Sequence, residues 1–390
     1  MSNTQEGSKK LFTEYTEAGE RKNYSLLETL LRNRMEKLYG NKKRAYRDTH
    51  AKSHAAVKAH IEIFDIDEGE IGAKLSSTGL SPSYIEKLSI RQGLLARPGR
   101  YPVWLRFANG NGTRNPDSAA DTRSMSVKIM GVEGERLLES YETDNQDIIT
   151  QNCDIFFISS IGYYYSFLKA IFKSKISLII WLLFHIRQAL ALKKITSFAP
   201  KSLLTERYWS GSAYSLGKSL QPETCPDVAS RSYPAVVKYA FTPVSPEDPG
   251  HMLPRTPLDI PKKSLPINYY REELIEQLAK PDARFCWDLG IQIQSDTSMS
   301  IDDITVSWSE EKSPFISVGR LTVEHQLIDF DEQFDFCENL TFSPWNGLSA
   351  HQPVGALNRL RRLVYPLVAA YRHKKIGDDY REPTNLEMKD

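Results

Sequence analysis

Short segments in which apolar and polar residues alternate constrain the fold of this chain more than any other feature. Between residues 285 and 294 apolar side chains occupy every second position, and residues 57–63 repeat the pattern. Successive side chains of a strand point to opposite faces of a sheet, so this period of two predicts β-strands. Further strands are predicted at residues 102–109, 124–132, 155–159, 235–244 and 315–325. Several strands joined by turn-rich segments, with few helices between them, predict a closed antiparallel β-barrel.

Helical periodicity is confined to a few segments, which are predicted to cover the barrel and give an α+β fold. These helices are expected at residues 25–39, 163–194, 270–279 and 357–373. Residues 1–23 are polar and are expected to form a mobile N-terminal segment. No repeat or linker divides the remainder, so residues 24–390 are predicted to form a single domain.

Charge and cysteine content exclude several classes of protein. The formal net charge is +1, which argues against a nucleic-acid partner, because such proteins carry a basic surface. The four cysteines lie far apart without a CxxC pair, which is typical of reduced thiols in a cytoplasmic protein. The first residues contain no apolar stretch, so no secretory signal is expected.

The most apolar segment, residues 176–192, reads ISLIIWLLFHIRQALAL and has lysines on both sides. It approaches the length of a bilayer span, but His185, Arg187 and Gln188 interrupt it. A central arginine costs about 2.5–3.5 kcal/mol on insertion. Three interpretations follow: an interfacial helix in peripheral contact with a membrane, a helix that lines an apolar ligand channel, and a buried core helix.

A tyrosine lies between two arginines on the predicted C-terminal helix. At 100° per residue, Arg361, Tyr365 and Arg372 fall on one face. A guanidinium beside a phenol favours the phenolate, and tyrosine is a known proximal ligand of haem iron. The second arginine could bind a haem propionate. The alternative is a basic amphipathic helix whose tyrosine packs in a core.

A histidine-containing stretch leads directly into the first period-two strand. His50 stands four residues before a second histidine, His54, and both precede the strand at residues 57–63. A neutral imidazole can take a proton from a peroxide and return it to the leaving oxygen. A structural histidine is the alternative, and His54 and His60 compete for any role given to His50.

Six segments in a common order resemble haem catalases. They are Arg47-x-x-His-Ala-Lys52, Val103–Ala108, Asp121–Lys128, Asp147–Phe157, Phe342-Ser-Pro-x-Asn346 and Arg361-x-x-x-Tyr365-Pro366. The order and approximate spacing match over residues 40–375. Without the long C-terminal extension of large catalases, the chain is similar to the catalase-related group of compact haem proteins. That group includes coral allene oxide synthase and similar bacterial and fungal enzymes.

The resemblance implies a haem b site with Tyr365 as the axial iron ligand. It implies that Arg361 hydrogen-bonds the Tyr365 phenolate. Three further arginines would hold the haem propionates: Arg47, Arg106 and Arg372.

On the other side of the haem, the resemblance implies His50 as the distal acid and base. Asn152 is expected to be the distal amide, and the neighbouring Gln151 is the alternative. Tyr164 falls where large catalases stack an aromatic ring on the haem, with core packing as its alternative.

Two departures from the catalase pattern bear on the substrate. Thr49 replaces a residue that is usually aliphatic, and its hydroxyl could hydrogen-bond and restrain the imidazole, as in allene oxide synthase. Ala108 stands where catalases commonly have a serine, which removes a polar group near that ring. Both changes are expected to weaken reaction with hydrogen peroxide. The alternative for Thr49 is that threonine suits a strand entrance.

Three functions follow from these features. The first is conversion of fatty-acid hydroperoxides, by an allene oxide synthase-like or a cleaving reaction, with a lipoxygenase as the expected supplier of substrate. The second is a small catalase or peroxidase that acts on hydrogen peroxide or organic peroxides. The third is a non-catalytic haem- or lipid-binding protein that uses the barrel as a container. Retention of His50 alongside Tyr365 argues against the third.

Overall fold

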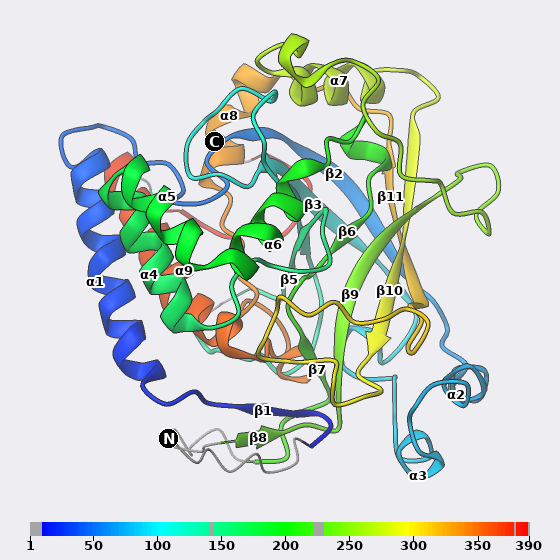
Figure 1. The fold of residues 1–390 in the computed structure, drawn as a ribbon. Helices are drawn as coiled ribbons and strands as arrows, with labels where there is room; N and C mark the ends of the chain where they lie inside the picture. The colour runs from blue at the N-terminus through cyan, green and yellow to red at the C-terminus, as the bar shows by residue number, and fades with distance from the viewer. Residues whose placement is uncertain (1–9, 141–142, 222–229, 378–379, 389–390) are drawn as a thin grey trace.

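Eight strands close into an antiparallel barrel in the computed structural model, which describes residues 10–140, 143–221, 230–377 and 380–388. Around the barrel the order is β10, β11, β2, β3, β4, β5, β6 and β9, and β9 pairs back with β10. Strand β7 adds to β9, and β1 and β8 form a separate pair. Figure 1 shows the barrel beside a layer of helices. The predicted α+β fold with a closed antiparallel barrel is confirmed.

The strands of the described residues are β1 (Thr13–Tyr15), β2 (Ser53–Ile63), β3 (Gly99–Asn109), β4 (Arg123–Ile129), β5 (Gln146–Gln151), β6 (Tyr208–Trp209), β7 (Tyr214–Leu216), β8 (Ser230–Ser232), β9 (Ala235–Val244), β10 (Arg284–Ile293) and β11 (Ile316–Glu324). The α-helices are α1 (Glu20–Tyr39), α2 (Glu68–Leu75), α3 (Pro82–Ile85), α4 (Ile161–Lys173), α5 (Lys175–Phe184), α6 (Ile186–Ser197), α7 (Tyr269–Leu278), α8 (Phe330–Asn339) and α9 (Ala356–Ile376).

Six of the predicted strands are present, as β2, β3, β4, β9, β10 and β11. The strand predicted at residues 155–159 is wrong, because the sheet uses Gln146–Gln151 instead. The apolar side chains of residues 155–158 pack into a second hydrophobic cluster with helices α1, α4 and α9. A short apolar run is compatible with either environment, so periodicity alone could not separate them.

Two predicted boundaries also change. The helix predicted over residues 163–194 is three helices, which break at Ser174 and His185. The segment expected to be mobile, residues 1–23, contains β1 and the start of α1, while residues 1–9 lie outside the described residues. Arg359 of α9 holds this region through ion pairs with Glu14 and Glu20.

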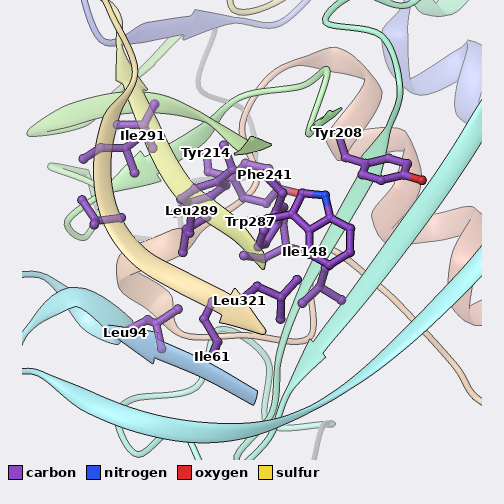
Figure 2. Packing of buried hydrophobic residues seen from close by; sticks show 14 of the residues in the cluster. Ile61, Leu94, Ile148, Tyr208, Tyr214, Phe241, Trp287, Leu289, Ile291 and Leu321 are labelled. Carbon is purple, nitrogen blue, oxygen red and sulfur yellow. The ribbon is translucent and has the colours of Figure 1, made fainter. Parts of the chain in front are cut away.

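The barrel interior is a packed core. Trp287, Leu289, Ile291 and Leu321 are fully buried, and Figure 2 shows Trp287 and Leu289 packed close to Phe241 and Leu321. Small barrels are commonly filled by side chains in this way. The interior therefore does not serve as a container for a ligand, and that part of the third hypothesis is wrong.

The helical layer lies outside the barrel and has its own core. Helices α1, α4 and α9 contact one another, and Leu27 and Leu31 of α1 are buried at a spacing of four residues. They pack with Leu360 of α9 and Phe167 of α4. Two separate cores leave a boundary between the barrel and the helices, and the candidate site lies at that boundary.

Candidate active site

A row of side chains on the outer face of the barrel forms the floor of a cavity. Arg106 of β3 pairs in register with Ser126 of β4, which pairs with Ile149 of β5. Their neighbours along each strand point into the barrel core, so alternation turns this row outward. Leu31, Tyr164 and further residues of α1, α4 and α9 form the opposite walls.

The cavity holds roughly 780 Å³ of empty space, part of it open to solvent. Its lining residues are Leu31, Arg47, Asp48, Thr49, His50, Arg106, Ser126, Ile149, Tyr164, Thr341, Phe342, Val364, Tyr365, Val368, Ala369 and Arg372. Seven of the nine predicted site residues are among them: Arg47, Thr49, His50, Arg106, Tyr164, Tyr365 and Arg372.

His50 is held in an unusual backbone conformation. Its φ angle is 57°, in the left-handed region that a non-glycine residue adopts rarely. Both backbone polar groups of His50 are bonded: the N–H donates to Gly110 O at 3.1 Å, and the carbonyl accepts from Arg106 Nη2 at 3.1 Å. Such residues persist where the surroundings over-determine them, often at functional sites.

The imidazole of His50 is neutral and has a defined tautomer. Burial, with repulsion from Arg106 and Arg361, lowers its pKa to about 3. Nδ1 lies 2.9 Å from Ser124 Oγ, whose hydroxyl donates to the Ala108 carbonyl at 3.1 Å. When the Ser124 hydroxyl donates to the Ala108 carbonyl, it accepts from Nδ1–H, and Nε2 then keeps a free lone pair.

Ser124 is therefore a site residue that sequence reasoning missed. Thr49 was expected to restrain the imidazole, but the hydroxyl bonded to the His50 ring belongs to Ser124, and Thr49 is exposed. Ser124 stands directly opposite Ala108 in the β3–β4 ladder. The hydroxyl absent at residue 108 is thus supplied from the next strand. The sequence predicted both strands of this pair, β3 and β4. Only the register between them, which the sequence did not predict, places Ser124 beside His50.

In the peroxide reaction that the resemblance implies, replacing Ser124 with alanine is expected to lower turnover by up to about tenfold, since one hydrogen bond contributes about 0.5–1.5 kcal/mol. Thr49→Val, the matched control on the other side of the ring, should change turnover by less than about twofold. Steady-state peroxide consumption measures both. A larger loss in Thr49→Val than in Ser124→Ala would contradict the assignment of Ser124.

Tyr365 lines the cavity from α9, with Arg361 one turn before it. The Arg361 guanidinium carbon lies 6.0 Å from the centre of the Tyr365 ring. Arg361 Nη1 donates to Ser212 Oγ at 2.9 Å and to Asn358 Oδ1 at 3.0 Å, and both partners are buried. These contacts hold the guanidinium beside the tyrosine. Among the described residues Arg361 makes no hydrogen bond to the Tyr365 oxygen and lies outside the cavity lining, so the bond that the resemblance implies is not present. The role of Tyr365 as a ligand stays a prediction.

Three arginines converge on Glu338, a second residue that sequence reasoning missed. Arg106 Nη2 lies 3.3 Å from one carboxylate oxygen and Arg47 Nη1 lies 3.5 Å from the other. Arg47 and Arg372 also donate to the Glu338 backbone carbonyl. Burial opposes ionisation of the carboxyl group, but Arg106 and Arg47 keep its pKa below the ordinary value. Three positive charges therefore share one buried carboxylate.

This cluster carries uncompensated positive charge. Burial and repulsion from Arg106 and Arg372 lower the pKa of Arg47 well below its ordinary value. Burial lowers the pKa of Arg372 to about 10. The Nε atoms of Arg106 and Arg372 are buried without a hydrogen-bond partner among the described residues. An anion bound beside the cluster would balance this charge.

Asn152 and Gln151 lie outside the cavity lining. Asn152 is buried, and its Oδ1 accepts from the backbone N–H of Arg123 at 2.8 Å. Gln151 Nε2 donates to the Ile155 carbonyl at 2.7 Å. Both amides thus support the chain after β5, where it leaves the sheet. The structure does not bring the expected distal amide to the cavity.

The competing histidines also lie elsewhere. His54 is fully buried, with Nε2 2.9 Å from Asn109 Oδ1, and His60 lines a separate surface hollow. Another buried histidine, His351, accepts from the Leu94 N–H at 2.9 Å. Of the candidates in the first strand region, His50 therefore has the position that a reacting group needs.

Two buried histidines make stability depend on pH. Burial lowers the pKa of His54 to about 3 and of His351 to about 4, against 6.5 in the unfolded chain. At these two rings the unfolded chain binds more protons, so their own contribution to stability is expected to fall as pH drops from 6.5 towards 4. At pH 5 each histidine contributes up to about 2 kcal/mol to this loss. NMR titration of the two ring signals in the native protein measures these pKa values, and signals that titrate near pH 6.5 would contradict the prediction.

Comparison with solved structures shows a catalase-like fold. Catalase A from Saccharomyces cerevisiae superposes with a TM-score of 0.60 at 16% identity, over 90% of this chain and 64% of that chain. A fungal catalase gives 0.58 at 17%, over 88% and 62%, and a bacterial catalase gives 0.58 at 17%, over 90% and 63%. This chain thus spans less than two thirds of each. Neither protein-family models nor curated proteins give a match. At this identity the likeness establishes the fold, and the function must be argued from the site.

Proposed function

We propose that this chain is a haem-dependent enzyme that acts on peroxides, with fatty-acid hydroperoxides as its substrates. The observation that carries the proposal is the meeting of His50, Tyr365 and three arginines in one cavity. Their segments are far apart in the sequence, yet all five side chains line the same space. A core histidine or a core tyrosine would not need this arrangement.

The arginine cluster fits the two propionates of haem b. Three guanidinium groups and one carboxylate leave two positive charges, and haem b carries two carboxylates. In addition, the Nε atoms of Arg106 and Arg372 are hydrogen-bond donors without an acceptor among the described residues. Arginine binds carboxylates through strong, often bidentate hydrogen bonds. The charge and the donor set therefore match this cofactor, whereas a neutral lipid would leave the cluster unsatisfied.

Tyr365 is the residue that would bind the haem iron. It lines the cavity, and Arg361 is held beside it by Ser212 and Asn358. The ionised phenol is the form that binds a metal. When bound, the haem iron would supply the redox chemistry that cleaves the O–O bond of a peroxide.

His50 is suited to move the proton of the substrate. Its pKa of about 3 keeps the ring neutral at physiological pH. Ser124 holds Nδ1, so the lone pair of Nε2 is available to accept the hydroperoxide proton and to return it to the leaving oxygen. The backbone bonds of His50 fix the ring at the cavity wall.

Apolar lining favours a fatty-acid hydroperoxide over a small polar peroxide. Leu31, Ile149, Phe342, Val364 and Val368 give the cavity an apolar lining in addition to the arginines. Such a lining can bind an acyl chain by removing it from water. A lipoxygenase is the class of enzyme that would supply this substrate.

A small catalase or peroxidase is the second candidate. The Ser124 hydroxyl occupies the place that Ala108 leaves empty, so the polar surroundings of His50 are retained. This observation removes one of the two reasons to expect weak reaction with hydrogen peroxide. The other reason was that Thr49 would restrain the His50 imidazole. It no longer applies, because the hydroxyl bonded to that ring belongs to Ser124.

A comparison of substrates decides between the two candidate functions. Haem-loaded protein is assayed for turnover of hydrogen peroxide and of several polyunsaturated fatty-acid hydroperoxides. We expect kcat/KM to be at least about 100-fold higher for one of the lipid hydroperoxides, with an allene oxide or cleavage products identified by mass spectrometry. Rapid oxygen release from hydrogen peroxide without lipid turnover would favour the second candidate. Protein that shows no Soret band after addition of haem would overturn both.

A further inference from the structure

Helices α5 and α6 present a row of exposed apolar side chains on the outside of the helical layer, where Figure 1 shows both helices. We call this row the apolar ridge; it comprises Ile176, Ile179, Ile180, Leu183, Phe184, Ile186 and Leu190, each at least 50% exposed. Scattered exposed apolar residues are normal, but a contiguous row marks an interaction site.

The ridge is one of two apolar faces of α5. Ile176, Ile179 and Leu183 follow the spacing of a single helical stripe. On the other side Trp181 is buried, with its ring 5.3 Å from that of Phe167 in α4. Helix α5 therefore lies along the protein with one apolar face inward and one outward. The inward face accounts for its attachment to α4, and the outward face needs another explanation.

The charge around the ridge has one sign. Residues 155–205 contain no Asp or Glu, but they contain Lys169, Lys173, Lys175, Arg187, Lys193, Lys194 and Lys201. Arg187 and Lys201 form ion pairs with Asp303 and Asp259. Within the described parts of the chain, the lysines that flank the ridge at both ends have no ion pair: Lys173, Lys175, Lys193 and Lys194.

We propose that the apolar ridge docks this protein onto the surface of an anionic lipid bilayer. Apolar side chains of such a helix enter the boundary between head groups and acyl chains, while the flanking lysines meet anionic head groups. A second copy of this chain is a poorer occupant, because the four unpaired lysines beside the ridge on each copy would repel each other. Among the described residues no single helix could cross a membrane, and α5 and α6 have the necessary length and hydropathy only as a pair bent by 113°.

The docking surface lies one helix away from the cavity. Trp181 Nε1 of α5 donates to Ser166 Oγ of α4 at 2.9 Å, and Tyr164, two residues earlier on α4, lines the cavity. A fatty-acid hydroperoxide partitions into a bilayer, so docking would bring the cavity to its substrate. This consequence rests on the proposed function, but docking itself does not depend on haem or on turnover.

Flotation of the full-length protein with large unilamellar vesicles tests the proposal. Vesicles of phosphatidylcholine alone are compared with vesicles that contain about one third phosphatidylserine, at about 0.1 M and 0.5 M salt. We expect binding to the anionic vesicles, with at least about tenfold weaker binding at high salt or without phosphatidylserine. Leu183→Ser with Phe184→Ser should weaken binding at least about tenfold. Leu327→Ser, at an 80% exposed leucine elsewhere on the surface, is the matched control and should change nothing.

A second variant acts through charge and leaves the ridge intact. Replacing Lys173, Lys175, Lys193 and Lys194 with glutamine should abolish the preference for anionic vesicles, since each lysine contributes about fivefold. Wild-type protein that floats with neither kind of vesicle would overturn the proposal, as would ridge variants that bind like the wild type. A dimer that is lost in the ridge variant, without vesicle binding, would show that a second copy covers the ridge. The Soret band of each sample reports haem binding independently. Failure of the docking proposal is thereby distinguished from failure of the haem assignment.

Discussion

Tyr365→Phe is expected to lower haem affinity by at least about 100-fold and to abolish peroxide turnover. The change removes only the phenol oxygen, which is the atom that would bind the iron. Loss of groups that merely support a metal ligand costs about 10–100-fold in affinity, so loss of the ligand should cost at least as much. Titration of the apoprotein with haem, followed at the Soret band, measures the effect.

Tyr371→Phe is the matched control for this experiment. Tyr371 lies on the same helix, but its hydroxyl donates to Glu36 at 2.8 Å and it is not among the cavity-lining residues. The control should bind haem as the wild type does. A Tyr365→Phe protein with full haem loading and an unchanged spectrum would contradict the ligand assignment, and Arg361 beside it would then need another role.

His50→Asn is expected to lower peroxide turnover by about 100- to 10,000-fold while haem binding is retained. The substitution removes the base, yet asparagine tolerates the left-handed conformation that residue 50 adopts, with φ at 57°. The backbone should therefore stay in place, and the loss should reflect proton transfer. Steady-state peroxide consumption and the Soret band, measured on the same sample, separate the two effects.

The pH profile adds a second test of His50. Because burial and the neighbouring arginines lower its pKa to about 3, turnover by the wild type should not fall between pH 8 and pH 5 through protonation of this ring. His60→Asn, at a histidine in a separate surface hollow, is the control and should keep full turnover. Undiminished activity in His50→Asn would show that another group accepts the proton.

Glu338 explains why the arginine cluster can exist before a cofactor binds. Like-charged groups buried together repel one another strongly unless a counter-charge is present. The Glu338 carboxylate and its backbone carbonyl hold Arg47, Arg106 and Arg372 in one place. The cluster is thus arranged in advance for an anionic ligand, which lowers the ordering cost of binding.

Several features could be predicted because their signals are local. Alternation within residues 285–294 depends only on neighbouring positions, so β10 was predicted correctly. The helix face shared by Arg361, Tyr365 and Arg372 follows from helical geometry alone. The strand predicted at residues 155–159 is wrong, because an apolar run suits several environments. The helix predicted at residues 163–194 is three helices, because a helix break depends on packing.

The sequence by itself determined six of the eight barrel strands, the tyrosine between two arginines and the histidine at the entrance to β2, because each signal lies within one helix or one strand. The tertiary structure decided which partners these residues have. Ser124 meets His50 across 74 residues, and Glu338 meets Arg47 across 291. Such contacts depend on strand register and on the packing of helices against the barrel, which no local pattern encodes. The outward direction of the apolar ridge was decided in the same way, because the burial of Trp181 against α4 leaves the opposite face of α5 exposed.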